Sequence, residues 1–139
     1  MSKKRPRAAV PRFQVLDSEA LSKAVRGDRA MIARIAVAAE LDAVVMTSPM
    51  TVVEAHDGRT SEHRWDWVLS RLVVPDLGKE QARAARRLLA SAGLHGHKHA
   101  IDAALAVVAN AQPGAVTVYT SDVDDLARLV DSRVVVQQV

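Results

Sequence analysis

The sequence predicts a three-layer α/β/α fold, in which helices cover both faces of a mostly parallel central sheet of four to five strands. Short runs of β-branched residues alternate along the chain with longer segments of helical periodicity. One of these runs, "AVVMT" at residues 43–47, is apolar throughout, which is typical of a strand buried on both faces. Parallel strands of this kind are joined by right-handed helical crossovers, so we expect helices between them.

Turn residues and caps separate the expected elements in the first half of the chain. The β-type run "RFQVLD" ends at Asp17, and Gly27 ends the short helix that follows. Ser48 and Pro49 suit the N-cap and the first position of a helix that carries Glu54. The expected strands are 12–17 and 43–47, and the expected helices are 18–25, 29–42, 48–58 and 61–71.

Proline and glycine also mark the boundaries in the second half. Pro75 stops the short run "LVVPD", and Gly93 closes an amphipathic helix. The loop "LHGHKH" then precedes a helix that is apolar nearly all the way round, which is typical of a core helix. The expected strands are 72–76, 116–120 and 133–139, and the expected helices are 79–93, 98–111 and one that starts within 121–130.

The composition narrows the class of protein. The chain has 139 residues, of which 49% are apolar, so it can form one domain with a sizeable core. It has no cysteine, which excludes disulfides and thiolate metal sites and is compatible with a cytoplasmic protein. No apolar run approaches the roughly 20 residues of a membrane span, and no signal-peptide segment follows the basic N-terminus, so we expect no membrane partner.

The formal charge of +3 is unevenly distributed. Residues 1–12 contain five of the 19 Lys and Arg and no acidic residue, which leaves 14 basic and 16 acidic groups, a balance of −2, for the rest. We therefore expect a basic, flexible tail at residues 1–11 and a single domain at residues 12–139. Such a tail can contact phosphates without reading a sequence, or it can simply solubilise the end of the chain.

Four acids fall where a sheet of this kind forms its sites, outside the carboxyl ends of the strands. Asp17 ends the first strand, and Asp122 follows the strand at 116–120 by two residues. Glu54 lies in the helix after the second strand. Asp102 shares a helical face with alanines that let its helix lie close to the sheet. We expect these four carboxylates to share one cleft.

Carboxylates that share a cleft stay ionised together only near a cation. Ligand sets made of oxygen suit Mg²⁺ or Mn²⁺ rather than Zn²⁺. Such ions lower the pKa of a bound water and stabilise charge on a phosphoryl group during in-line displacement. The four acids therefore predict a metal-dependent site that cleaves phosphodiesters.

Each acid also has a purely structural explanation. Asp17 could cap the helix that follows it, and Asp122 could stabilise the N-terminus of the next helix. Glu54 could be a solvated helix residue, and Asp102 could pair with Lys98 four residues earlier. It is less probable that all four explanations hold together at related positions of one sheet.

At these residues the sequence resembles the PIN-domain ribonucleases, especially the VapC-type toxins of bacterial toxin–antitoxin pairs. The segments "VLDSEAL", "TVVEAH", "HAIDAALA" and "VYTSDVDDLARL" carry the resemblance, which covers residues 13–136 through their order and spacing. It implies a PIN-like fold and an acidic pocket that holds Mg²⁺ or Mn²⁺. It makes Asp17, Glu54, Asp102 and Asp122 the catalytic, metal-binding acids, adds Asp125 and, less firmly, Asp124 to them, and makes Ser18, Thr120 and Ser121 supporting polar residues.

The same resemblance implies an activity and partners. The chain would be an endoribonuclease that cleaves single-stranded RNA with a metal-activated water and no covalent enzyme intermediate. It would form a homodimer and be silenced by a cognate antitoxin, which would place an Arg or Lys in the acidic pocket. The basic segment before the first acid is longer than in the simplest toxins.

Three other functions are alternatives to the nuclease. A PIN-like module that binds RNA or protein without cutting is the main one, although four intact acids argue against it. A phospho-acceptor receiver domain needs a lysine at the end of its last strand, and "SRVVVQQV" contains none. A dinucleotide-binding enzyme needs a glycine-rich turn after its first strand, which is also absent.

The loop "LHGHKH" places His95, His97 and His99 at alternate positions. An extended segment would present three imidazoles on one side, as a zinc site requires. We favour a His-rich loop that binds no metal, because no nearby acid or cysteine completes the set. Such a loop could line an RNA groove.

Two further features could contact a partner. Arg83, Arg86 and Arg87 lie on one expected helix and form either a solvated face or a surface for RNA or an acidic antitoxin. Trp65 and Trp67 point different ways on a helix, so we expect at least one to be exposed.

Overall fold

The computed structural model describes residues 10–139, so most of the expected tail, residues 1–9, lies outside the described part. Within that part, four strands form one parallel sheet in the order β2-β1-β3-β4. No helix there has both the length and the apolar character needed to cross a bilayer. The strands are β1 (Arg12–Leu16), β2 (Val44–Met46), β3 (Ala115–Thr120) and β4 (Val135–Gln138). The helices are α1 (Ser18–Val25), α2 (Arg29–Glu40), α3 (Pro49–Glu54), α4 (Glu62–Ser70), α5 (Lys79–Ala92), α6 (Gly96–Asn110) and α7 (Val123–Ala127).

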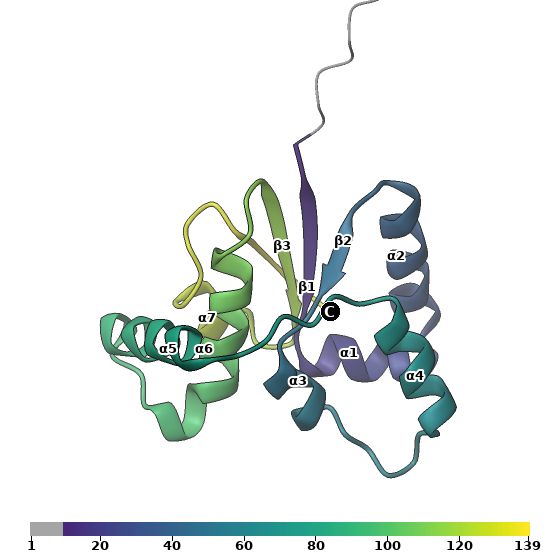
Figure 1. Ribbon diagram of the computed structural model, residues 1–139, viewed down its shortest axis with the longest axis horizontal. Helices are drawn as coiled ribbons and strands as arrows, with labels where there is room; N and C mark the ends of the chain where they lie inside the picture. The colour runs from purple at the N-terminus through teal and green to yellow at the C-terminus, as the bar shows by residue number, and fades with distance from the viewer. Residues whose placement is uncertain (1–9) are drawn as a thin grey trace, which may run out of the picture.

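The sheet separates two groups of helices, which confirms the predicted three-layer α/β/α fold (Figure 1). Helices α1, α2 and α4 cover one face, whereas α6 and α7 cover the other and α5 packs against α6. Side chains alternate along β1 between the two faces. Leu16 packs in the core with α1, α2 and α4, and Val15 packs in the second core with Leu105 and Leu126.

All four strands run in the same direction, so their carboxyl ends meet at one edge of the sheet. The register aligns Val15 with Met46 on β2 and Leu16 with Tyr119 on β3. Helix α3 and the first half of α6 lie at this edge (Figure 1). The residues that follow β1 and β3 are therefore brought next to α3 and α6.

Short polar residues begin several of the helices, as the sequence predicts for Ser48. The Asp28 side chain accepts a hydrogen bond from the N–H of Met31 and caps α2. The Ser48 hydroxyl caps α3 through the N–H of Met50. The expected helix at 29–42 is two residues too long, because Asp42 takes a positive φ of 54° and leaves the helical region. The expected helix at 48–58 is likewise shorter and ends at Glu54.

The expected strand at 72–76 is wrong. Only an isolated bridge forms there, between Met46 and Val73. The N–H of Val73 donates to the carbonyl of Val45, and the carbonyl of Val73 accepts from Thr47. Pro75 then interrupts the pairing, because it has no N–H to donate. The sheet consequently has four strands.

The expected helix at 98–111 starts two residues earlier than predicted, which shortens the loop before it. Helix α6 begins at Gly96, with the extended residue His95 at its N-cap. His97 and His99 therefore lie in the first turns of a helix, where positions two residues apart point to different sides. His97 is exposed and His99 is buried. The extended arrangement of three imidazoles does not form.

Candidate metal centre

Asp17 is the most firmly held of the expected site residues. It follows β1 directly and is 6% exposed. Its Oδ1 accepts a hydrogen bond from the N–H of Ala20 at 2.8 Å, so Asp17 does cap α1. Its Oδ2 accepts from the N–H of Ser121 at 3.0 Å, which joins the end of β1 to the loop after β3. The capping explanation is therefore correct for one oxygen and does not explain the other.

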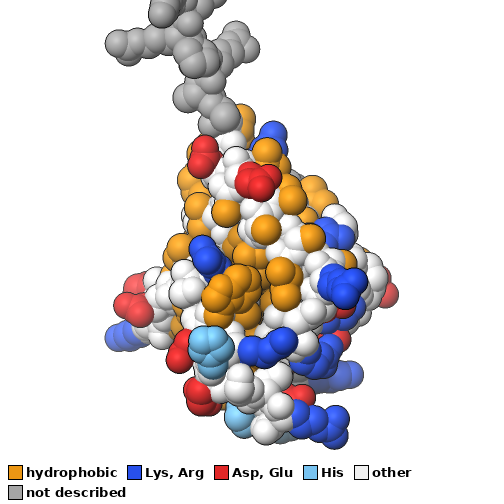
Figure 2. Space-filling model, turned by 90° about the vertical axis from the view of Figure 1, so that its right-hand side faces the viewer, with side chains coloured by type: hydrophobic (Ala, Val, Ile, Leu, Met, Phe, Trp, Pro, Cys, Tyr) orange, Lys and Arg blue, Asp and Glu red, His pale blue; other side chains and the backbone are white. Residues whose placement is uncertain are grey.

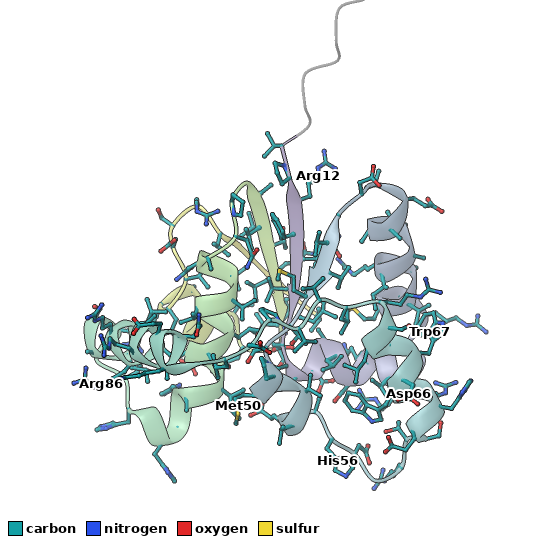
Figure 3. All side chains as sticks on the ribbon, in the orientation of Figure 1. Arg12, Met50, His56, Asp66, Trp67 and Arg86 are labelled. Carbon is teal, nitrogen blue, oxygen red and sulfur yellow. The ribbon has the colours of Figure 1, made fainter. Side chains whose placement is uncertain are left out.

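The four expected acids line one open pocket of about 520 Å³ at the carboxyl edge of the sheet. They come from four different elements: Asp17 follows β1, Glu54 ends α3, Asp102 lies in α6 and Asp122 follows β3. Because these elements are far apart in the sequence, the convergence is a property of the fold. Other lining residues are Ser18, Met50, His97, Lys98 and Ser121. Figure 3 labels Met50 on α3, at the side of the helix that faces α6.

Asp102 has the most strongly perturbed titration in the pocket. Its side chain is half-buried, and this burial, followed by the surrounding negative charges, raises its pKa from 3.8 to about 6. The charges that contribute belong to Asp122, Glu54, Asp125 and Asp17, in decreasing order. Among residues 10–139, no ion pair joins Lys98 to Asp102. The explanation that Asp102 pairs with Lys98 is therefore not supported.

Hydrogen bonds hold the loop after β3. The N–H of Asp122 donates to the Thr120 hydroxyl at 2.8 Å, and the N–H of Ser121 donates to Asp17. Asp122 occupies the N-cap position of α7, but its side chain makes no capping hydrogen bond. Partial burial, and then the neighbouring Asp125 carboxyl, raise the pKa of Asp122. Asp122 is among the residues that line the pocket.

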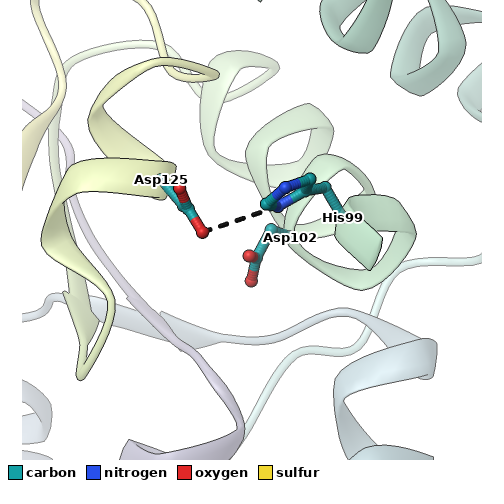
Figure 4. Close-up of side chains that lie close together, drawn as sticks. All are labelled: His99, Asp102 and Asp125. Carbon is teal, nitrogen blue, oxygen red and sulfur yellow. Dashed lines mark ion pairs between the residues drawn. The ribbon is translucent and has the colours of Figure 1, made fainter. Parts of the chain in front are cut away.

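His99 and Asp125 extend the acidic site on the side of α7. His99 Nδ1 lies 3.5 Å from Asp125 Oδ2. A dashed line marks this ion pair in Figure 4. His99, Asp102 and Asp125 each offer one ligand atom, and these atoms lie within 4.8 Å of one another. Asp124 is exposed and does not belong to this group. From the sequence, His99 was considered as a ligand only together with His95 and His97, although its spacing of three from Asp102 on a helix was a usable signal.

The residues of the site fit a divalent cation. Four carboxylates line the pocket and Asp125 lies close to one of them, Asp102. Burial, followed by the charges of the other four acids, raises the pKa of Asp102. The ligand types are carboxylate oxygens with one imidazole nitrogen, a donor set that divalent metal ions accept. Asp17 is held by two backbone N–H groups, which fix the direction of its carboxylate.

The basic residues of α5 lie outside the pocket. Arg83, Arg86 and Arg87 are not among the residues that line it. Arg83 pairs with Glu80 at 3.8 Å on the surface of the helix. Figure 3 shows Arg86 at the outer end of the layer formed by α5 and α6. These arginines form an exposed face of α5.

An apolar face lies over α2 and α4, on the side of the sheet away from α5 and α6 (Figure 1). Figure 2 shows hydrophobic side chains gathered in its middle, with Lys and Arg around them. A pocket of about 310 Å³ opens there between Ile35 and Trp67. Trp67 is 40% exposed and Trp65 is buried, so the prediction that at least one tryptophan is exposed is confirmed. Val37 and Leu41 add further exposed apolar surface.

Comparison with protein families and with curated proteins gives no match for this chain. Among solved structures, it is similar to a chain in the crystal structure of VapBC2 from Rickettsia felis bound to a DNA fragment from their promoter. The TM-score is 0.65 and the sequence identity is 14%, over 91% of this chain and 98% of that chain. At this identity the similarity concerns the fold alone. The similarity covers nearly the full length of both chains.

Proposed function

We propose that this chain is a metal-dependent endoribonuclease, which cleaves phosphodiesters of single-stranded RNA through a metal-activated water. The observation that carries the proposal is the convergence of Asp17, Glu54, Asp102 and Asp122 in one pocket. Uncompensated carboxylates at such close quarters are costly, as the raised pKa of Asp102 indicates. A polyanion also reaches such a pocket only if a cation neutralises it.

The chain's residues would divide the work as follows. Asp17, Asp102, Asp122 and Glu54 would hold Mg²⁺ or Mn²⁺, with Asp125 beside them. When bound, one or two such ions supply a water of lowered pKa and neutralise charge on the phosphoryl group. Asp17 would act as the rigid ligand because two backbone N–H groups orient it. Glu54 is exposed at the end of α3 and would act at the mouth of the pocket, where RNA enters.

Three polar residues would support these acids. Thr120 holds the N–H of Asp122 with its hydroxyl, and Ser121 donates its own N–H to Asp17. Ser18 lines the pocket beside Asp17. Their proposed role is to position ligands, since a misplaced carboxylate binds a cation less tightly.

We further propose that the chain is the toxin of a type II toxin–antitoxin pair, of VapC type and with a PIN-like domain over residues 12–139. The similar structure from Rickettsia felis is a complex named VapBC2 bound to promoter DNA, which supports an antitoxin partner. The apolar face over α2 and α4 offers surface for a protein partner or a second copy of the chain. The homodimer, the cytoplasmic location and the basic tail at residues 1–11 stay predictions.

A cleavage assay tests the activity. A labelled pool of single-stranded RNA is incubated with the protein and Mn²⁺, Mg²⁺ or EDTA. The proposal predicts cutting with metal and none with EDTA. A folded protein that binds Mn²⁺ and retains RNA without cutting any of the pool would instead support the PIN-like binding module.

A further inference from the structure

The imidazole of His99 is placed differently from the other histidines of the chain. His99 is 7% exposed, whereas His56, His63, His95 and His97 are exposed. It lies on α6 one turn before Asp102 and faces Asp125 of α7 (Figure 4). The polar atoms of a buried imidazole need partners, so what surrounds its ring decides what it does.

The contact with Asp125 does not fully satisfy that ring. The distance from Nδ1 to Oδ2 is 3.5 Å, beyond the roughly 2.7–3.2 Å of an N–H···O hydrogen bond. Asp102 approaches the same ring, so two carboxylates converge on one imidazole. The ion pair with His99 explains the position of the Asp125 carboxylate but not that of the Asp102 carboxylate. A shared cation explains both.

The spacing of the three ligand atoms suits one small ion. Nitrogen and oxygen ligands lie about 2.1 Å from such a metal, so two ligands of one ion are at most about 4.2 Å apart. The atoms offered by His99, Asp102 and Asp125 lie within 4.8 Å of one another. One ion can hold all three only if the side chains rotate inward, by about half an ångström for a pair on opposite sides of the ion and by more for a pair at right angles.

The nitrogen atom changes which cation the site prefers. Mg²⁺ favours oxygen ligands, whereas imidazole binds transition-metal ions well. We infer that His99, Asp102 and Asp125 form a cation position with mixed nitrogen and oxygen ligands that takes a first-row transition-metal ion, such as Mn²⁺, in preference to Mg²⁺. This inference rests on the proposed function, because Asp102 and Asp125 belong to the same acidic site. It adds a ligand, His99, and a choice of metal.

Electron paramagnetic resonance of Mn²⁺ bound to the full chain tests the inference without any RNA. Electron spin-echo modulation reports nitrogen nuclei bound to the ion, and labelling with nitrogen-15 histidine identifies them as imidazole. We expect histidine modulation in the unaltered protein. It should be lost in His99→Asn and kept in His97→Asn, which alters an exposed histidine that lines the same pocket.

Affinities give the second readout. His99→Asn should weaken Mn²⁺ binding at least about tenfold and Mg²⁺ binding much less, whereas His97→Asn should change neither. Bound Mn²⁺ without histidine modulation in the unaltered protein would overturn the inference, as would modulation lost only in His97→Asn. If His99→Asn does not fold, the labelled unaltered protein and His97→Asn still decide the question.

The outcomes also separate this inference from the proposed nuclease. Histidine modulation in a protein that cuts no RNA would support the cation position and count against the nuclease. RNA cleavage with Mn²⁺ bound only through oxygen would support the nuclease and overturn the role of His99. A protein that binds no Mn²⁺ at millimolar concentration would overturn both.

Discussion

The Asp17 carboxylate accepts a hydrogen bond from the N–H of Ser121, at 3.0 Å and 104 residues away in the sequence. The same side chain caps α1 through the N–H of Ala20. One buried acid therefore fixes the relative positions of β1, α1 and the loop after β3, where Asp122 lies. In our account this residue is at once a structural element and a metal ligand.

Asp17→Asn should consequently lower both activity and stability. The amide has only one acceptor oxygen, so either Ala20 or Ser121 loses its partner, at a cost of about 1–3 kcal/mol. Urea unfolding of the metal-free protein measures this cost. Asp28→Asn is the matched control, since Asp28 caps α2 with a single bond that asparagine can also accept. Equal stabilities of the two variants would show that the bond to Ser121 contributes nothing.

Asp102→Asn, in contrast, should increase the stability of the metal-free protein. Burial and neighbouring charges raise the pKa of Asp102 to about 6, so the ionised form destabilises the fold. A shift of one pKa unit corresponds to about 1.4 kcal/mol. Because Asp102 is only half-buried, screening by solvent reduces the expected gain to about 1–2 kcal/mol at neutral pH.

The pH dependence of that gain follows from linkage. Above about pH 6 both the folded and the unfolded chain carry the Asp102 charge, and the full penalty is present. As the pH falls from about 6 to 3.8, the folded chain binds the proton first and the penalty disappears. Urea unfolding in EDTA across this range should show the advantage of Asp102→Asn shrinking toward acid. An advantage that is constant with pH would contradict this explanation.

Mn²⁺ should raise the melting temperature of the unaltered chain. A ligand present at about 100 times its dissociation constant stabilises the folded state by about 2.7 kcal/mol, which corresponds to several degrees. Asp102→Asn should lose most of this shift. Asp66→Asn, which alters an exposed acid of α4 far from the pocket lining, should keep it. An unchanged melting temperature of the unaltered protein in millimolar Mn²⁺ would contradict the proposed metal site.

Thr120→Val should weaken metal binding although Thr120 does not line the pocket. Valine keeps the shape of threonine but removes the hydroxyl that accepts the N–H of Asp122. The loop that carries Asp122 would then shift, and a loss of about 10- to 100-fold in Mn²⁺ affinity is expected. Thr117→Val on the same strand is the control, and isothermal titration compares the two. Equal affinities would remove Thr120 from the supporting residues.

The fold and the convergence of the four acids could be predicted from the sequence for the same reason. Parallel strands have their carboxyl ends at one edge of the sheet, so acids that follow different strands lie at the same edge. Asp102 could be placed because alanines on its helical face predict close packing against the sheet. Ala106 and Ala109 are indeed fully buried.

The errors have local physical causes. "LVVPD" has the composition of a strand, but Pro75 limits its pairing to a single bridge. The segment "HGHKH" has little helical signal of its own, yet α6 starts within it at Gly96, and His99 lies 3.5 Å from Asp125 of α7. His99 was treated as one of three alternating loop imidazoles, although the helix expected at 98–111 includes it, and its proximity to Asp102 and Asp125 was therefore missed.

RNA cleavage by matched acid variants tests most directly whether the acidic pocket is an active site. Asp102→Asn and Asp66→Asn are compared with the unaltered chain on the same single-stranded RNA pool with Mn²⁺, after each is shown to be folded. We expect Asp66→Asn to cut like the unaltered chain and Asp102→Asn not to cut. Equal cutting by Asp102→Asn would contradict this expectation, because the pocket at the carboxyl edge of the sheet would then not be the active site.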